Sequence, residues 1–147
     1  MKLKNHIEHY KFEAKYFDYL ALDKFAVQEI RRRYEELFYL YKLKKNDKIL
    51  EIGAGAGFAL NHVDPTIHSY FPIDISAYNL KRVEEKAEGE IYPVSGDVFK
   101  LPFPSDSFDF ILLSEVVEHL NDPLEALTEL YRVLKPEGTL IVSVPYK

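Results

Sequence analysis

Cysteine is absent from all 147 residues, which excludes disulfide bonds, zinc–thiolate sites, iron–sulfur clusters and cysteine nucleophiles. No run approaches the ~20 consecutive apolar residues that span a bilayer. Residues Met1 to Tyr10 alternate charged and apolar side chains and lack the apolar core of a secretion signal. We therefore expect a cytoplasmic protein without a membrane span.

The excess of acidic residues lies in one part of the chain. Residues 1–48 carry 12 Lys/Arg and 8 Asp/Glu, whereas residues 49–147 carry 7 and 16, for a total charge of −5. An acidic body disfavours nucleic acid as the main partner. The basic first part is typical of a solvated helix face, and it is also suited to a phosphate or an acidic partner.

The length and the 47% hydrophobic content suit one domain with its own core. A seam of charged and turn-forming residues at 44–47 separates two styles of sequence. Apolar residues at helical spacing from Phe25 to Tyr41 predict a helix, and an aromatic-rich stretch from His9 to Leu22 suggests another. We expect a helical cap over 1–45 and an α/β domain over 46–147, which together form one compact unit.

After the seam, short apolar runs alternate with helical stretches. The predicted strands are 49–52, 67–75, 91–94, 108–113 and 139–144. Helices are predicted from near Phe58, from Ser76 to Gly89 and from Asp122 to Leu134, with a turn at 135–138. This order predicts a mostly parallel five-stranded sheet in an α/β domain.

A glycine-rich loop, Gly53-Ala54-Gly55-Ala56-Gly57, follows the first predicted strand. Glycines there permit a tight turn and a close approach of the backbone to a ligand. The spacing G-x-G-x-G differs from the dinucleotide fingerprint G-x-G-x-x-G, and no Gly-Lys-Ser/Thr of a phosphate loop follows. The loop alone is also compatible with a plain turn.

Two acidic residues follow the next strands. Asp74 ends the second strand, near the separation at which doubly wound folds place an acid on a ribose diol. A single Asp there also suits a turn, but its pairing with the glycine loop favours the ribose. Asp97 follows the third strand and suits either an adenine amino group, with Val98 against the ring, or a plain loop.

The chain resembles class I S-adenosylmethionine-dependent methyltransferases over residues 46–145. The matching segments come in the family's order and spacing: Ile49 to Gly57, Asp74, Gly96-Asp97, Leu101-Pro102-Phe103, Ser107-Phe108-Asp109 and Leu134 to Leu140. The resemblance implies a Rossmann-like fold with flanking helices and an N-terminal helical cap. It also implies S-adenosylmethionine as the cofactor.

The resemblance further implies a role for each matching position. The methionine end of the cofactor would be surrounded by Glu51, Gly53, Ala54, Gly55 and Gly57. The ribose would lie at Asp74 and Ile75, and the adenine at Asp97 and Val98. Ser114 and Glu115 would lie beside the reaction centre, and the N-terminal segment, with Tyr10, Tyr16 and Phe17, would close the pocket or pack as core.

Methyl transfer from a sulfonium is an in-line displacement that needs positioning more than a nucleophilic side chain. His119 is the best candidate for a base, with Glu115 as a second catalytic residue. Glu115, Glu118 and His119 also resemble the pattern of quinone-pathway O-methyltransferases and of metal-using RNA 2′-O-methyltransferases. No later histidine completes such a set, so no metal site is assigned; a polar helix end is the competing interpretation of His119.

Members of the family usually continue past the fifth strand, whereas this sequence stops at Lys147. Strand 139–144 would then be an exposed edge, which a second copy or a partner subunit would cover. We therefore expect methyl transfer to a small-molecule acceptor. The alternatives are a cofactor-binding module that depends on a partner, and a metal-assisted RNA 2′-O-methyltransferase.

Overall fold

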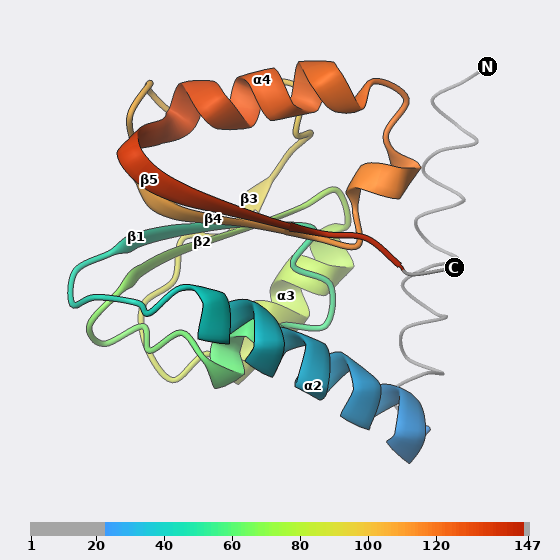
Figure 1. Cartoon of the computed structure of the whole chain (residues 1–147). Coiled ribbons are helices and arrows are strands. Elements are labelled where there is room, and N and C mark those ends of the chain that lie inside the picture. Colours follow the sequence, from blue (N-terminus) through green and yellow to red (C-terminus); the bar gives the residue numbers. More distant parts are fainter. Residues whose placement is uncertain (1–22, 146–147) are drawn as a thin grey trace.

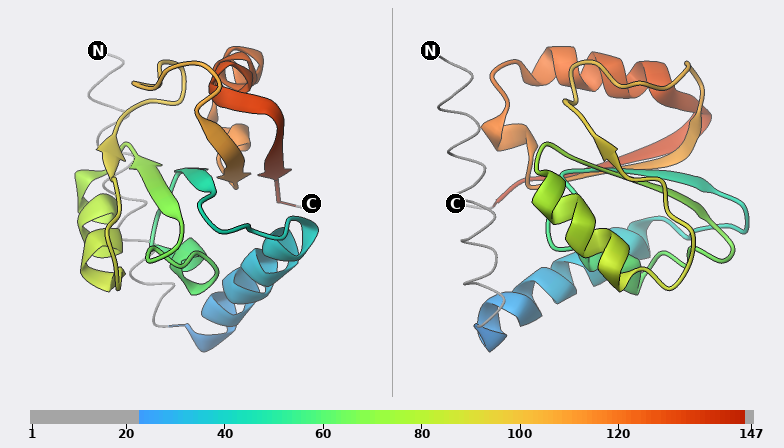
Figure 2. Two further views of the ribbon diagram at one scale, coloured as in Figure 1. Left: turned by 90° about the vertical axis from the view of Figure 1, so that its left-hand side faces the viewer. Right: turned by 180° about the vertical axis from the view of Figure 1, so that it is seen from behind.

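The computed structural model describes residues 23–145, and its sheet lies between two layers of helix. Figure 1 shows helix α4 (Pro123–Val133) on one face and helices α2 (Lys24–Leu40) and α3 (Ala77–Lys86) on the other. The further views in Figure 2 show the same arrangement. The stretch from His9 to Leu22, with Tyr10, Tyr16 and Phe17, lies outside the described residues.

Five parallel strands form the sheet in the order β3-β2-β1-β4-β5. Their bounds are β1 Lys48–Ile52, β2 Ser69–Asp74, β3 Val94–Ser95, β4 Phe108–Ser114 and β5 Leu134–Ser143. The order reverses between β1 and β4, and ligands of open α/β sheets bind beyond the carboxyl ends of the strands at such a switch point. The predicted parallel, Rossmann-like fold is confirmed.

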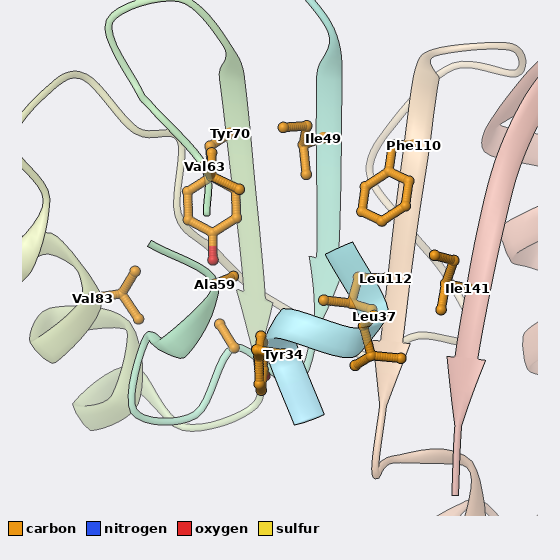
Figure 3. Close-up of a cluster of buried hydrophobic side chains, with 11 residues drawn as sticks. Tyr34, Leu37, Ile49, Ala59, Val63, Tyr70, Val83, Phe110, Leu112 and Ile141 are labelled. Atoms are coloured by element: carbon orange, nitrogen blue, oxygen red, sulfur yellow. The ribbon is translucent and has the colours of Figure 1, made fainter. Parts of the chain in front are cut away.

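Alternation along the strands divides the apolar side chains between two cores. Ile49, Phe110 and Leu112 face the first core, which contains Tyr34 and Leu37 of α2. Figure 3 shows these side chains gathered on one face of the sheet, with Tyr70 of β2 among them. Their neighbours along the strands, among them Leu50 and Ile111, face the second core beneath α4, where Ala126, Leu130 and Val133 are fully buried. The segment before the predicted seam therefore packs on the sheet through α2.

The helices begin where their side chains can cap them. Asp23 accepts the backbone N–H of Phe25 at the start of α2, Ser76 caps α3, and Asp122 accepts the N–H of Glu125 at the start of α4. Pro123 then occupies the first turn of α4, where a missing N–H costs nothing. Both downstream helices thus begin where the sequence predicts.

The predicted helix after the glycine loop is wrong in extent. The structure has only a 3₁₀ turn, η1 (Phe58–Asn61), in this place. Pro65 follows closely and disfavours a helical conformation for Asp64. Asp64 instead begins a turn in which its carbonyl accepts the N–H groups of Ile67 and His68, so β2 begins at Ser69 and not at 67.

The third and fifth strands also differ from their predicted bounds. Pro93 has no N–H to donate, and Ile91 makes only an isolated bridge to Tyr70, so β3 is reduced to Val94–Ser95. The predicted turn at 135–138 lies inside β5: Leu134 pairs with Phe108 and Thr139 with Phe110, and the residues between loop out. Among residues 23–145, no helix has the length and apolarity that crossing a membrane requires.

Candidate cofactor site

Three predicted site residues lie at the carboxyl ends of neighbouring strands. Gly53 follows β1, Asp74 ends β2 and Ser114 ends β4. Glu51, Asp74 and Ser114 are all buried, with exposed fractions of 1%, 7% and 7%. The parallel register therefore brings together residues that lie far apart in the sequence, on both sides of the switch point.

The glycine loop needs its glycines for two different reasons. Gly53, Gly55 and Gly57 all have positive φ angles, of 74°, 49° and 75°. A Cβ on Gly53 would lie 2.5 Å from Cγ2 of Val116, so a side chain there would collide with the core. A Cβ on Gly55 would meet nothing closer than the carbonyl oxygen of Gly53, at 3.8 Å. The loop is therefore tight at Gly53 and open at Gly55, where a ligand can approach the backbone.

Asp74 connects the glycine loop to the start of α3. Its carboxylate accepts the backbone N–H of Gly55 at 2.9 Å, the N–H of Ser76 at 2.8 Å and Nδ2 of Asn79 at 3.2 Å. A carboxylate offers about four acceptor positions, so one remains for a ligand hydroxyl. Oδ1 of Asn79 is buried beside it without a hydrogen-bond partner among the described residues.

Glu51 lies beneath the loop with both carboxylate oxygens engaged by tyrosines. The hydroxyl of Tyr34 donates to Oε1 at 3.0 Å, and the hydroxyl of Tyr70 donates to Oε2. Burial raises the pKa of Glu51 to about 7, although both hydroxyls act to lower it. Burial, followed by the charge of Glu51, raises the pKa of each tyrosine, so both remain donors at neutral pH.

The carboxyl end of β4 carries a second polar group of side chains. Oγ of Ser114 lies 2.9 Å from Oγ of Ser143, and Ser143 also donates to Glu115 at 3.3 Å. Arg33 of α2 approaches the same Glu115 carboxylate at 3.5 Å. Glu115 has a φ of 56°, a strained conformation for a residue with a side chain. Glu115 is thus held by groups from β5 and from α2.

The structure does not bring His119 into this group. It ends the 3₁₀ turn η2 (Val117–His119) with half of its side chain exposed, and Nε2 lies 3.8 Å from Oε1 of Glu118. No hydrogen bond or ion pair within residues 23–145 joins it to Glu115. Glu115, Glu118 and His119 do not form a group that could hold a metal ion. The short turn does not bring these three side chains to one point in the part of the chain that the structure describes.

The remaining predicted cofactor residues lie in different environments. Ile75 is 44% exposed at the end of β2, and Asp97 is exposed beyond β3, where its carboxylate accepts the N–H of Phe99. Ala54 and Val98 are buried in the first and the second core. Ile75 and Asp97 are therefore accessible to a ligand, whereas Val98 packs with core residues.

Sequence reasoning missed four residues of this region: Arg33, Tyr34, Tyr70 and Ser143. Tyr34 lies within the stretch from Phe25 to Tyr41 whose spacing predicts a helix, and its hydroxyl carries no separate signal. By the alternation of a strand, Tyr70 shares a face of β2 with Pro72, and Ser143 shares a face of β5 with Ile141, but this pattern does not indicate the polar partners of their hydroxyl groups. Nothing in the sequence indicates that Arg33 reaches Glu115.

Comparison with known proteins identifies the family. Residues 50–142 match the family described as "Methyltransferase domain". The chain belongs to this family. A ubiquinone/menaquinone biosynthesis C-methyltransferase of Neisseria meningitidis is 36% identical over 106 residues, which cover 68% of this chain and 43% of the relative. The match places residues 50–142 in the methyltransferase-domain family, in agreement with the resemblance of the sequence.

Solved structures agree with this assignment. A SAM-dependent methyltransferase from Aquifex aeolicus has a TM-score of 0.65 and 26% identity, covering 74% of this chain and 62% of that one. A putative methyltransferase in complex with the Haloferax volcanii Trm112 methyltransferase activator has a TM-score of 0.71 and 25% identity, covering 80% and 55%. The chain spans less than half the length of these curated relatives.

Proposed function

We propose that this chain binds S-adenosylmethionine at the carboxyl ends of β1, β2 and β3 and takes part in methyl transfer to a small-molecule acceptor. One observation carries the proposal: the N–H of Gly55 donates to the Asp74 carboxylate at 2.9 Å, whereas a Cβ on Gly55 would meet nothing closer than the carbonyl oxygen of Gly53, at 3.8 Å. A backbone surface without a Cβ beside a buried acceptor suits the close approach of an adenosyl ligand. The family assignment supports the same ligand.

The chain's own residues fit the parts of such a ligand. Asp74 has an acceptor position left for a ribose hydroxyl, and Asn79 Oδ1 adds a buried acceptor without a partner among the described residues. Ile75 offers an exposed apolar surface for a base, and Asp97 offers an exposed carboxylate for an amino group. Gly55 admits the methionine end to the backbone of the loop.

On the other side of the switch point, Glu115 and Ser143 would hold the acceptor. S-adenosylmethionine supplies a methyl group that is already activated on a sulfonium. The chain then needs to orient the acceptor and to take up any proton that the acceptor loses. Glu115 is suited to that proton because its carboxylate is fixed by Ser143 and Arg33. A small-molecule acceptor agrees with the named relative, which is a C-methyltransferase of quinone biosynthesis.

The cofactor assignment is tested by calorimetric titration of the full chain with S-adenosylmethionine, with NAD as the control ligand. We expect binding of S-adenosylmethionine alone, at least tenfold weaker in Asp74→Asn and unchanged in Glu85→Gln. Glu85 is the matched control because it is an exposed carboxylate on the neighbouring helix α3, paired with Lys81 at 3.8 Å. Binding of NAD, or equal affinities of wild type and Asp74→Asn, would count against the proposal.

A second candidate, a cofactor-binding subunit that needs a partner for turnover, is favoured by the edge strand β5. Val142 of β5 is 42% exposed, and within residues 23–145 β5 pairs with β4 alone. Such an edge can accept another strand. The Haloferax volcanii neighbour is itself found with an activator protein. Cofactor binding without methylation of an acceptor panel, followed by methylation once a partner is added, would favour this candidate over independent activity.

A further inference from the structure

Glu51 is a buried carboxylate for which no residue between 23 and 145 supplies a cationic partner. It lies two residues before Gly53, is 1% exposed, and receives only the hydroxyl groups of Tyr34 and Tyr70 among the described residues. The negative charge of Asp74 repels that of Glu51 and acts to raise the pKa of Glu51. An ionised carboxylate in such a place is costly unless hydrogen bonds or a bound cation stabilise it.

The two tyrosines that support Glu51 come from different layers. Tyr70 belongs to β2 and is fully buried in the sheet, whereas Tyr34 is carried by α2 and reaches Glu51 from outside the sheet. The next residue back, Arg33, approaches Glu115 at the end of β4. Neighbouring residues of α2 thus contact the ends of β1 and β4, the two strands on either side of the switch point.

We propose that Tyr34 is a positioning residue of the cofactor site, which holds the Glu51 carboxylate beneath the glycine loop and thereby couples docking of α2 to cofactor binding. The inference rests on the proposed function, because S-adenosylmethionine carries two cationic groups and one carboxylate. Its net positive charge favours the ionised form of Glu51, which the Tyr34 hydroxyl also favours. By linkage, the hydroxyl strengthens binding of the cofactor, and the cofactor strengthens docking of α2.

The pH dependence of binding distinguishes positioning from mere packing. Burial raises the pKa of Glu51 to about 7, so the affinity of the wild type for S-adenosylmethionine should rise with pH through this range. Charged groups near Tyr34 are Arg33 and Glu115, and both remain in Tyr34→Phe. Loss of the hydroxyl should shift the dependence of affinity on pH toward higher pH by about one pH unit. Binding would then be several-fold weaker at pH 7 and would recover by about pH 9.

The experiment is calorimetric titration of the full chain with S-adenosylmethionine between pH 6 and pH 9. Tyr41→Phe is the matched control. Tyr41 lies just beyond the end of the same helix, and its hydroxyl donates a hydrogen bond to Asp47 and not to Glu51. Its profile should coincide with that of the wild type. An unshifted profile in Tyr34→Phe, or a loss of equal size at every pH, would overturn the inference while leaving the proposed function intact. A wild type that binds no S-adenosylmethionine would overturn both.

A second measurement needs no variant and so does not depend on Tyr34→Phe folding. Hydrogen exchange of the wild type is compared with and without saturating S-adenosylmethionine. We expect slower exchange of backbone amides in α2, with the largest change around Arg33 and Tyr34, and little change in the middle of α4. Equal exchange of α2 in both states would show that docking and binding are independent and would overturn the inference.

Discussion

Nζ of Lys135 lies 2.7 Å from Oδ1 of Asp109, and the backbone N–H of Lys48 donates to the other oxygen of the same carboxylate at 2.9 Å. The carboxylate thereby joins β1, β4 and β5 at the end of the sheet opposite the glycine loop. Asp109 and Lys135 belong to two of the segments on which the family resemblance rests. In this structure their contribution is to hold strands together, away from the cofactor site.

We predict that Asp109→Asn lowers the free energy of unfolding by about 1 kcal/mol at pH 7. Partial burial acts to raise the pKa of Asp109, but the hydrogen bonds and charges of Lys135 and Lys48 outweigh it and lower the pKa. A lowered pKa gives stability that is present above the unfolded value near 4 and is lost as pH falls through the folded value. The variant should therefore approach the wild type at pH 2 to 3.

Urea unfolding at pH 7 and at pH 2.5 checks this prediction. Glu36→Gln serves as the control, because its carboxylate pairs with Arg32 on the exposed side of α2 and should contribute little at either pH. A deficit in Asp109→Asn of the same size at both pH values would contradict the assigned linkage.

Much of the fold was predictable because its signals are local. The capping residues Ser76 and Asp122 mark the starts of α3 and α4, and the apolar run 110–113 marks a central strand covered on both faces. The errors have local causes too. Pro65 follows η1 and Pro93 precedes β3, and both elements are shorter than predicted. Strand β5 pairs with β4 at Leu134 and again from Thr139, so the turn-forming residues between them predict a break in the strand.

The candidate site was predictable only where backbone conformation constrains the residue type. Positive φ angles require glycine at 53, 55 and 57, and this requirement is visible in the sequence. Contacts between side chains on separate elements leave no such trace. The hydroxyl of Tyr34 donates a hydrogen bond to Glu51, which lies 17 residues later in the sequence. Arg33 forms an ion pair with Glu115, which is still further away in the sequence. His119, which stood out as a residue type, lies apart from Glu115 on an exposed turn.

Glu51 should make the protein less stable as pH rises. Its folded pKa of about 7 exceeds the ordinary value of 4.5, so the folded state binds more protons between these values. The contribution of Glu51 to the free energy of unfolding is therefore greatest below about pH 4.5. It falls by about 3 kcal/mol as the pH rises from there through 7. Glu51→Gln should remove this part of the pH dependence and exceed the wild type in stability at pH 8.

Denaturant unfolding of the two proteins at several pH values from 5 to 8 checks this prediction. The difference between them is the relevant quantity, because other groups titrate equally in both. Glu85→Gln on the exposed face of α3 is the control for the loss of one carboxylate. A difference that stays constant from pH 5 to pH 8 would contradict the raised pKa of Glu51.

Two glycine substitutions should separate the stability of the loop from its ligand surface. Gly53→Ala places a Cβ 2.5 Å from Val116 at a positive φ, so we expect a loss of about 3 kcal/mol in unfolding free energy. Gly55→Ala meets open space and costs only the backbone strain, about 1 kcal/mol. Its added methyl group occupies the surface proposed for the cofactor, so binding should be lost although the variant folds.

Thermal unfolding and calorimetric titration with S-adenosylmethionine measure the two effects on each variant. Gly96→Ala is the control, since a Cβ there would make only ordinary contact with Val94 at 3.9 Å. If Gly55→Ala kept wild-type affinity, the open face of the loop would not be the ligand surface.

Arg132 of α4 should fix the loop between β3 and β4. Its guanidinium donates to the carbonyl oxygens of Phe103 at 2.8 Å and Leu101 at 3.2 Å, and Glu129 holds it in place at 2.7 Å. Arg132→Met keeps much of the aliphatic packing but removes these donors, so we expect a loss of about 2 kcal/mol. Limited proteolysis should then cut within residues 101–107 faster than in the wild type, whereas Arg32→Met on the exposed face of α2 should leave the cleavage rate unchanged. Equal cleavage of Arg132→Met and wild type would mean that the packing of Leu101 and Phe103 against the second core holds the loop without the arginine.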